Sequence, residues 1–327
     1  MSSLAPPSVP SRRLPGRSES VSEISFVLAT GGPRALAGDP AIPSLRRARE
    51  AGVTTFRVAD RSSLEGTGRL LRMAFPAPDP LLTVIVPCDR DALARISPAG
   101  RAASEPGGRV RAWVAQCRQV LPDGTRLIAV WHAEGAPSDL DRAVRAGLET
   151  LIDERTLLGV AYSVPLAFAE AGAIAGVARA GPGLLEGDLS PLDPELVSQL
   201  EPLAPRGDFA LIATDPLAGG RLDGSRFSSS LSDRTPGAAP PSIRALQAEF
   251  DPVLRLARLT EGRRRTLAQA SLRFVLSWPW VATAVVPWPS PERLDEILST
   301  PRTPPLSAEE IERVRGSGRD RGDSGSV

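Results

Sequence analysis

The sequence predicts a parallel α/β fold, because short apolar strands alternate with amphipathic helices along most of the chain. The chain has 327 residues, and 42% of them are hydrophobic. That is enough for a large core, and a single domain of about 250 residues is common among α/β barrels. Alternation, length and apolar content together favour one large α/β domain.

Seven strands are expected from short runs rich in β-branched residues, at residues 25–29, 54–58, 82–86, 126–131, 157–161, 209–214 and 283–287. Helical periodicity is expected at residues 42–50, 64–74, 110–120, 140–153, 194–203, 243–256, 266–277 and 291–298. An eighth strand is expected within residues 174–189, a Gly-rich stretch with weak patterning. Because strands alternate with helices, neighbouring strands should run parallel.

Local signals support three helix starts. Ser138 or Asp139 can cap the helix expected from residue 140. Pro291 stands where a first helical turn tolerates proline. Ser307 and Glu310 form a capping-box pattern before a last helix. These signals place elements in the chain and carry no functional information.

Both ends are expected to be disordered. Residues 1–22 are rich in Ser, Pro and Arg, and residues 316–327 are rich in Gly, Ser, Asp and Arg. The folded domain is therefore expected at residues 23–315. Residues 221–241, rich in Ser, Gly and Pro, are expected to form a long exposed loop after a late strand.

The composition excludes several classes of function. The formal net charge is +1, which points to neither nucleic acid nor an acidic membrane as a partner. No apolar run approaches a membrane span, and the N-terminus does not resemble a secretory signal. Two cysteines form neither a disulfide framework nor a metal-binding spacing. We therefore expect a cytoplasmic protein that needs no metal.

The basic residues are unusual, because all 39 are arginine and the chain has no lysine. It also has a single histidine, His132, and a single tyrosine, Tyr162. Any mechanism that depends on a lysine of lowered pKa is excluded.

Several segments resemble the aldo-keto reductase family. The strongest are residues 266–277 (TLAQASLRFVLS), 281–287 (VATAVVP), 291–298 (PERLDEIL), 305–310 (PLSAEE) and 213–222 (ATDPLAGGRL). Looser matches lie at residues 45–53, 63–71, 127–132 and 158–160. The resemblance runs from about residue 24 to 314, and it implies an eight-stranded β/α barrel.

The resemblance implies carbonyl reduction by a nicotinamide, with four side chains in defined roles. In the family, a tyrosine protonates the alkoxide, and a lysine paired with an aspartate lowers the tyrosine's pKa. A histidine orients the carbonyl. Arg57 stands here at the aspartate position, about Pro87 at the lysine position, and the loop that should carry the tyrosine has none. Asp60 lies three positions too far along to replace the aspartate.

Three residues remain candidates near the expected site. His132 is in register, either as a general acid or base or as a hydrogen-bonded strand-end residue left from ancestry. Cys88 could be a thiolate stabilised by Arg57, although a small buried packing residue is the favoured alternative. Tyr162 stands where the family has an amide-binding asparagine, and a packing role at the rim is expected.

The resemblance also implies an NADP site, whose outline is only partly kept. Barrel enzymes bind phosphate with the loops after strands seven and eight and a short helix N-terminus. Trp288 replaces the family's glycine and would narrow the phosphate slot or stack on a flat ligand, and Arg293 could reach a phosphate or be a surface arginine. The candidate cofactor contacts are Pro216, Leu217, Gly219, Trp288, Ser290 and Arg293.

Three functions stay open from the sequence. The first is a degenerate, pseudoenzyme-like barrel that binds a small molecule at its C-terminal mouth or acts as a scaffolding or regulatory protein. The second is an enzyme that uses His132 for a cyclisation, isomerisation or elimination, with Arg57 or Arg61 as an anion clamp. The third is a slow NADP-dependent oxidoreductase, since loss of a general acid removes about 10²–10⁴ in rate.

Overall fold

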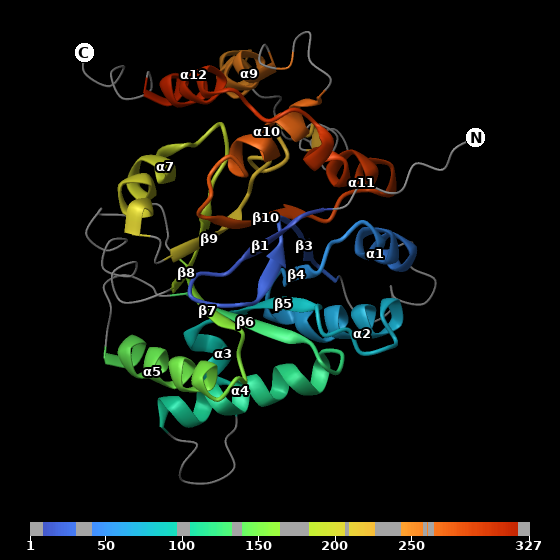
Figure 1. Ribbon diagram of the computed structural model, residues 1–327, viewed down its shortest axis with the longest axis vertical. Helices are drawn as coiled ribbons and strands as arrows, with labels where there is room; N and C mark the ends of the chain where they lie inside the picture. Colours follow the sequence, from blue (N-terminus) through green and yellow to red (C-terminus); the bar gives the residue numbers. More distant parts are fainter. Residues whose placement is uncertain are drawn as a thin grey trace.

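The protein is a closed barrel of eight parallel strands surrounded by helices, as the sequence predicted (Figure 1). The computed structural model describes residues 9–30, 41–96, 105–132, 139–163, 183–206, 209–225, 243–257, 260 and 265–319. Strands β3 to β10 follow one another around the barrel, and β10 pairs with β3 to close it. Parallel strands bring all their C-terminal ends to one end of the barrel, which we call the mouth.

The barrel strands are β3 (Ile24–Leu28), β4 (Thr55–Val58), β5 (Thr83–Cys88), β6 (Arg126–His132), β7 (Gly159–Ser163), β8 (Gly183–Asp188), β9 (Phe209–Thr214) and β10 (Val281–Pro287). The described α-helices are α1 (Ala41–Glu50), α2 (Leu64–Ala74), α3 (Arg90–Ala94), α4 (Pro106–Val120), α5 (Asp139–Asp153), α7 (Glu195–Leu200), α9 (Ile243–Ala257), α10 (Leu267–Val275), α11 (Pro291–Leu298) and α12 (Ala308–Arg319). Short 3-10 turns lie at Arg61–Ser63, Glu201–Arg206 and Thr300–Arg302.

The barrel separates two apolar cores, because successive strand residues face opposite sides. Inside it, medium-sized aliphatic side chains such as Ile85, Ile128 and Ile212 pack together. Outside, large aromatic side chains such as Phe56 and Trp131 pack between strands and helices. The interior is therefore filled by side chains, and functional groups are confined to the strand ends.

The N-terminal segment corrects one prediction. Residues 11–22 form a hairpin of β1 (Ser11–Arg13) and β2 (Ser20–Ser22) instead of a disordered tail. Leu14 and Val21 of this hairpin join the interior core and plug the end of the barrel opposite the mouth. The folded domain thus begins before residue 23, while residues 1–8 lie outside the described part of the chain.

One arginine explains why this polar segment is ordered. Arg12 donates from Nε to Glu23 at 2.7 Å, and from its Nη atoms to the carbonyls of Leu276, Trp278 and Val281 at 2.7–2.8 Å. These partners belong to the turn before the last strand. The order therefore comes from contacts more than 260 residues apart in sequence, which local composition cannot reveal.

The C-terminal end corrects a second boundary. Helix α12 continues to Arg319, past the predicted limit at residue 315, and residues 320–327 lie outside the described part. The predicted capping box is present: Glu310 accepts from the Ser307 backbone at 2.7 Å, and the Glu310 backbone donates to Ser307 Oγ at 3.3 Å. Of the predicted long loop, residues 226–241 are not described.

Candidate functional site

The side chains that could carry chemistry lie at the mouth, on strands that are not neighbours in sequence. Arg57 is near the end of β4, and His132 ends β6. Glu186 lies on β8, and both His132 and Glu186 pair in register with Ser163 of the intervening β7. The barrel therefore places an arginine, a histidine and a carboxylate in one group.

Arg57 and Glu186 form a bidentate ion pair across the barrel. Arg57 Nε and Nη2 each lie 2.9 Å from a Glu186 carboxylate oxygen. The third nitrogen, Nη1, donates to the carbonyls of Val58 and Ala59 at 3.2 Å. The side chains are only 12% and 4% exposed. Because all three guanidinium nitrogens have protein acceptors, Arg57 is engaged within the fold and does not serve as the anion clamp. The alternative clamp, Arg61, stays a prediction.

His132 borders this pair without joining it. Its Nε2 lies 4.0 Å from Glu186 Oε1, and its side chain is 36% exposed. Burial lowers the pKa of His132 below its ordinary value; Glu186 opposes this shift, and Arg57 adds to it. At neutral pH the imidazole is therefore mainly neutral, which leaves one ring nitrogen free to accept a hydrogen bond.

Cys88 has the surroundings of the small buried packing residue that the sequence favoured over a thiolate. The side chain is fully buried at the end of β5. Burial raises the pKa of the Cys88 thiol well above its usual range, and nearby Cys117 and Asp89 raise it further. Arg57 is not among the groups that lower this pKa, because its charge is held by Glu186. The favoured alternative, a small buried apolar residue, fits these observations.

In the loop after β4, the polar side chains of Asp60 and Arg61 form hydrogen bonds with neighbouring groups of the protein. Asp60 accepts from the Ser63 backbone at 3.0 Å and from Ser62 Oγ at 2.5 Å, and so caps a short turn. These hydrogen bonds, led by that from Ser62, lower the pKa of Asp60. Arg61 Nη1 lies 3.4 Å from the Asp91 carbonyl. Asp60 therefore does not replace the missing catalytic aspartate.

Tyr162 faces away from the barrel interior. It packs against the outer core, and the Arg145 guanidinium of α5 lies over its ring at 5.2 Å. Burial raises the pKa of its phenol, and the hydroxyl has no hydrogen-bond partner among the described residues. The only tyrosine of the chain is therefore a packing residue, in keeping with its predicted register.

The loop after β9 has the outline expected of a phosphate-binding turn but is occupied by its own contacts. Leu217 is buried in the outer core, and the Pro216 carbonyl accepts from Ser271. Gly219 adopts a left-handed conformation (φ 62°), and its amide donates to Asp215 Oδ1 at 2.6 Å. This amide is therefore engaged by a carboxylate of the same loop.

The start of α11 is similarly closed. Ser290 stands at the N-cap position without a side-chain capping hydrogen bond in the described structure, the next residue is a proline without an amide hydrogen, and Glu292 places a carboxylate in the first turn. Arg293 donates to the Asp223 carbonyl, and its Nη1 lies 3.5 Å from Asp223 Oδ2. Trp288 packs edge-on against Phe26, with ring centroids 5.1 Å apart.

These residues do not fit a dinucleotide cofactor. A bound pyrophosphate needs free amides and a free cation. Among the candidate contacts, Arg293 pairs with Asp223, the Gly219 amide donates to Asp215, and Glu292 places an anion-repelling carboxylate at the helix start. A further arginine of the β9 loop, Arg221, donates from Nε to the uncharged Ala218 carbonyl at 3.0 Å. The candidate contacts therefore share one face of the barrel without forming an open phosphate site.

Sequence reasoning missed Glu186 and Asp223, the partners of the two arginines that it had identified. Glu186 lies in the weakly patterned segment where the eighth strand was expected. The sequence did contain one signal for such a partner. Arg57 stands at an inward-facing position of a strand, and a buried arginine there requires a carboxylate partner. Which carboxylate meets Arg57 depends on the curvature of the barrel and could not be read from sequence spacing.

Comparisons with known proteins agree with this architecture. The model of the Aldo/keto reductase family matches residues 170–318. The holo form of aldo-keto reductase AKR11C1 from Bacillus halodurans superposes with a TM-score of 0.66 at 17% identity, covering 94% of this chain and 95% of that one. The glycerol dehydrogenase AKR11B4 from Gluconobacter oxydans superposes with a TM-score of 0.69 at 16% identity, covering 97% of each chain. No match was found among curated proteins.

The fold and the arrangement of its strand ends define a (β/α)8 barrel with its polar group at the mouth. The predicted resemblance to the aldo-keto reductase family is confirmed over residues 170–318 by the family model, and the two solved structures share the barrel fold. Within the described residues, no helix is long and apolar enough to cross a membrane, and no group of three or more metal-ligating side chains occurs.

Proposed function

We propose that this protein is a degenerate aldo-keto reductase that binds a small molecule at the mouth and does not reduce carbonyls with a nicotinamide. The observation that carries the proposal is the Arg57–Glu186 ion pair. It puts a neutralised, hydrogen-bonded arginine where the resemblance requires an aspartate. The chain also contains no lysine that could take the role of the family's lysine beside the tyrosine.

The available groups are poor proton donors for an alkoxide. Tyr162 faces outward, so no phenol reaches the mouth. Burial keeps the pKa of His132 low, so only a small fraction of the imidazole carries a second proton at neutral pH. A general acid commonly contributes about 10²–10⁴ in rate, and the protein lacks one of suitable strength.

The remaining polar surface suits a neutral, polar ligand. His132 offers one donor and one acceptor in its neutral form, and a third of its side chain is exposed. A dinucleotide is disfavoured by the closed loops described above. We therefore expect a ligand that hydrogen-bonds to His132 and carries no phosphate.

A cofactor titration tests the proposal. Tryptophan fluorescence should show no saturable change with NADPH or NADH up to about 1 mM, well above the usual range of cofactor affinity. Trp288→Phe serves as the control, since Trp288 lies beside the expected slot and would carry a specific signal. Saturable micromolar binding, together with carbonyl reduction that is lost in His132→Gln, would overturn the proposal.

A second variant tests why the cofactor is disfavoured. Asp223→Asn removes the carboxylate beside Arg293, so any weak NADPH affinity should rise, by about tenfold for one freed charge-assisted contact. Calorimetry with the wild-type chain as reference measures the change. An unaltered affinity would show that neutralisation of Arg293 is not what closes the slot.

A non-redox enzyme is the second candidate, and one observation favours it. The neutral His132 imidazole lies 4.0 Å from the buried Glu186 carboxylate, an arrangement in which proton uptake by the imidazole would be stabilised. A ligand found for the mouth should then be converted to an isomer or elimination product, detectable by NMR. Conversion that continues unchanged in His132→Gln would rule this candidate out.

A further inference from the structure

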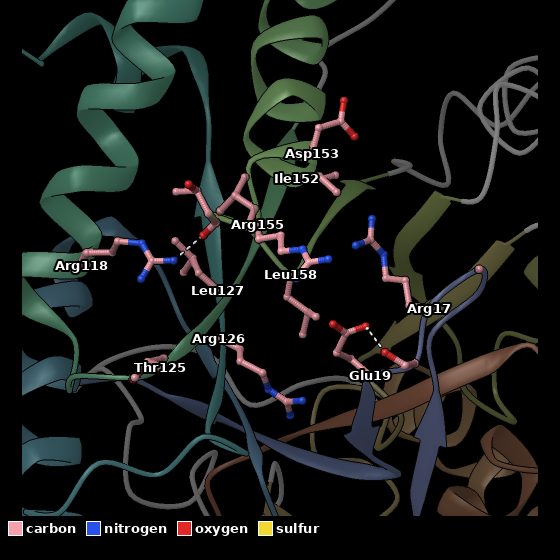
Figure 2. Close-up of a pocket in the computed structure, with 15 residues that line it drawn as sticks. Arg17, Glu19, Arg118, Thr125, Arg126, Leu127, Ile152, Asp153, Arg155 and Leu158 are labelled. Carbon is pink, nitrogen blue, oxygen red and sulfur yellow. Dashed lines mark hydrogen bonds between the residues drawn. The ribbon is translucent and has the colours of Figure 1, made fainter.

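A second polar site lies at the end of the barrel opposite the mouth. The turn of the N-terminal hairpin, the end of α4, the start of β6 and the turn between α5 and β7 surround a groove of about 640 Å³. We call it the basal groove (Figure 2). Its lining residues are Gly16, Arg17, Ser18, Glu19, Arg118, Gly124, Thr125, Arg126, Leu127, Ile152, Asp153, Arg155, Thr156, Leu157 and Leu158.

Four arginines and only two carboxylates line the basal groove. Arg118 donates to the Thr156 carbonyl, and Arg126 donates to the carbonyls of Ser20 and Leu81 at 3.0 and 2.7 Å. These bonds fix both arginines without neutralising them, because a carbonyl carries no net charge. The Nε of Arg126 is buried without a hydrogen-bond partner.

Arg17 and Arg155 have no carboxylate partner in the part of the chain that the structure describes. Figure 2 shows both side chains directed toward the same space above Leu158, although they come from different turns. Two like charges that converge in this way repel each other unless an anion lies between them. Glu19 and Asp153 also line the groove, yet neither forms an ion pair with these two arginines.

The backbone at Arg155 supports a role for its side chain. Arg155 has a φ of 56° and lies in the turn two residues after α5, with its amide donating to the Ile152 carbonyl at 2.8 Å. Helices usually place glycine at such a left-handed position. The C-terminal end of a helix favours a nearby cation, and this effect explains why an arginine stands at position 155. It does not explain why the side chains of Arg155 and Arg17 point toward the same space.

We propose that the basal groove binds a small phosphate-bearing molecule. A phosphate carries negative charge, and any two of its oxygens can accept a bidentate pair of hydrogen bonds from one guanidinium group. Two arginines can therefore bind the same phosphate. The groove is much larger than one phosphate. Its aliphatic residues Leu127, Leu157 and Leu158 provide a surface for the uncharged body of a phosphate ester.

Calorimetry of the full chain at constant ionic strength tests the site, with pyrophosphate as the probe. We expect saturable binding that weakens about tenfold in Arg17→Gln and in Arg155→Gly, the effect of losing one charge-assisted hydrogen bond. Arg155→Gly suits the test because glycine tolerates the left-handed backbone. Arg69→Gln, an exposed change on α2 outside the groove, should leave the affinity unaltered.

Two results would overturn the proposal. One is absence of binding up to about 10 mM pyrophosphate, and the other is an equal loss of affinity in the groove variants and in Arg69→Gln, which would indicate general charge attraction. Separate titrations with glucose 6-phosphate, glucose and phosphate test whether the groove also binds the uncharged part of a phosphate ester. We expect glucose 6-phosphate to bind more tightly than phosphate alone. The outcome is independent of the proposed function of the mouth, since the groove includes the start of β6 while His132 stands at the other end of that strand.

Discussion

The two ends of this barrel differ in whether their arginines are paired with carboxylates. At the mouth, Arg57 is paired with Glu186 and Arg293 with Asp223, so the strong cations are neutralised within the protein. At the base, Arg17 and Arg155 converge in a groove without a carboxylate partner among the described residues. At the mouth, these two arginines are therefore unavailable to an anion, whereas the two arginines at the base are available to one.

The largest effect should come from breaking the pair at the mouth. Arg57→Met leaves Glu186 buried without its partner, and we expect the free energy of unfolding to fall by about 3–5 kcal/mol. Denaturant unfolding measures the change. The double variant Arg57→Met/Glu186→Leu should recover most of it, because no charge is then left buried. A loss below about 1 kcal/mol in the single variant would mean that the pair is not closed in solution.

A smaller loss should follow from removing the arginine that anchors the base. Arg12→Leu removes donors to Glu23 and to three carbonyls, and we expect about 2–3 kcal/mol lower stability. Hydrogen exchange should then increase throughout the hairpin. Arg13→Ala is the matched control, since Arg13 is exposed on the same strand. Equal effects of the two changes would contradict a specific anchor.

Arg155→Gly should act in the opposite direction and stabilise the fold by about 0.5–1 kcal/mol, because glycine adopts the left-handed backbone without strain. Thermal unfolding without added anion measures this gain. Arg155→Ala keeps the strain and removes the side chain, so it should not be stabilising. A gain of equal size in Arg155→Ala would attribute the effect to charge repulsion with Arg17 instead of to the backbone.

The smallest effect is a pH dependence from His132. Burial is the main cause that lowers the pKa of His132 in the folded protein, whereas the unfolded chain keeps the ordinary value of about 6.5. Between these two pKa values the unfolded chain binds more protons than the folded protein. The free energy of unfolding therefore falls as the pH decreases through this window. Solvent screening at this partly exposed ring keeps the loss below about 1 kcal/mol.

NMR of the single histidine measures this pKa directly, because only one imidazole titrates. Unfolding at pH 5.5 and 7.5, compared between wild type and His132→Gln, isolates its contribution to stability. A midpoint above 6.5 would contradict the predicted direction and would mean that Glu186 outweighs burial at this site.

Most of the barrel could be predicted because its signals are local. The strand at residues 209–214 and the helices at residues 64–74 and 291–298 were expected at the bounds observed. The hairpin was missed because its composition matches disorder, while its order depends on contacts distant in sequence, among them the hydrogen bonds of Arg12 to carbonyls before and at the start of β10 and the packing of Leu14 and Val21. At the site, His132 and Arg57 were placed by resemblance. Glu186 was not, because the pair forms across the barrel and no sequence period connects its members.

Closure of the ring by β3 and β10 has a consequence for how the chain is made. The first barrel strand pairs with residues 284–287, so it remains without one neighbour until nearly the whole polypeptide has been synthesised. At about 5–20 residues per second, that interval is about 15–60 s. During it, β3 presents an open edge to other nascent chains. The hairpin before it cannot shield that edge early, because its anchoring carbonyls are also made last.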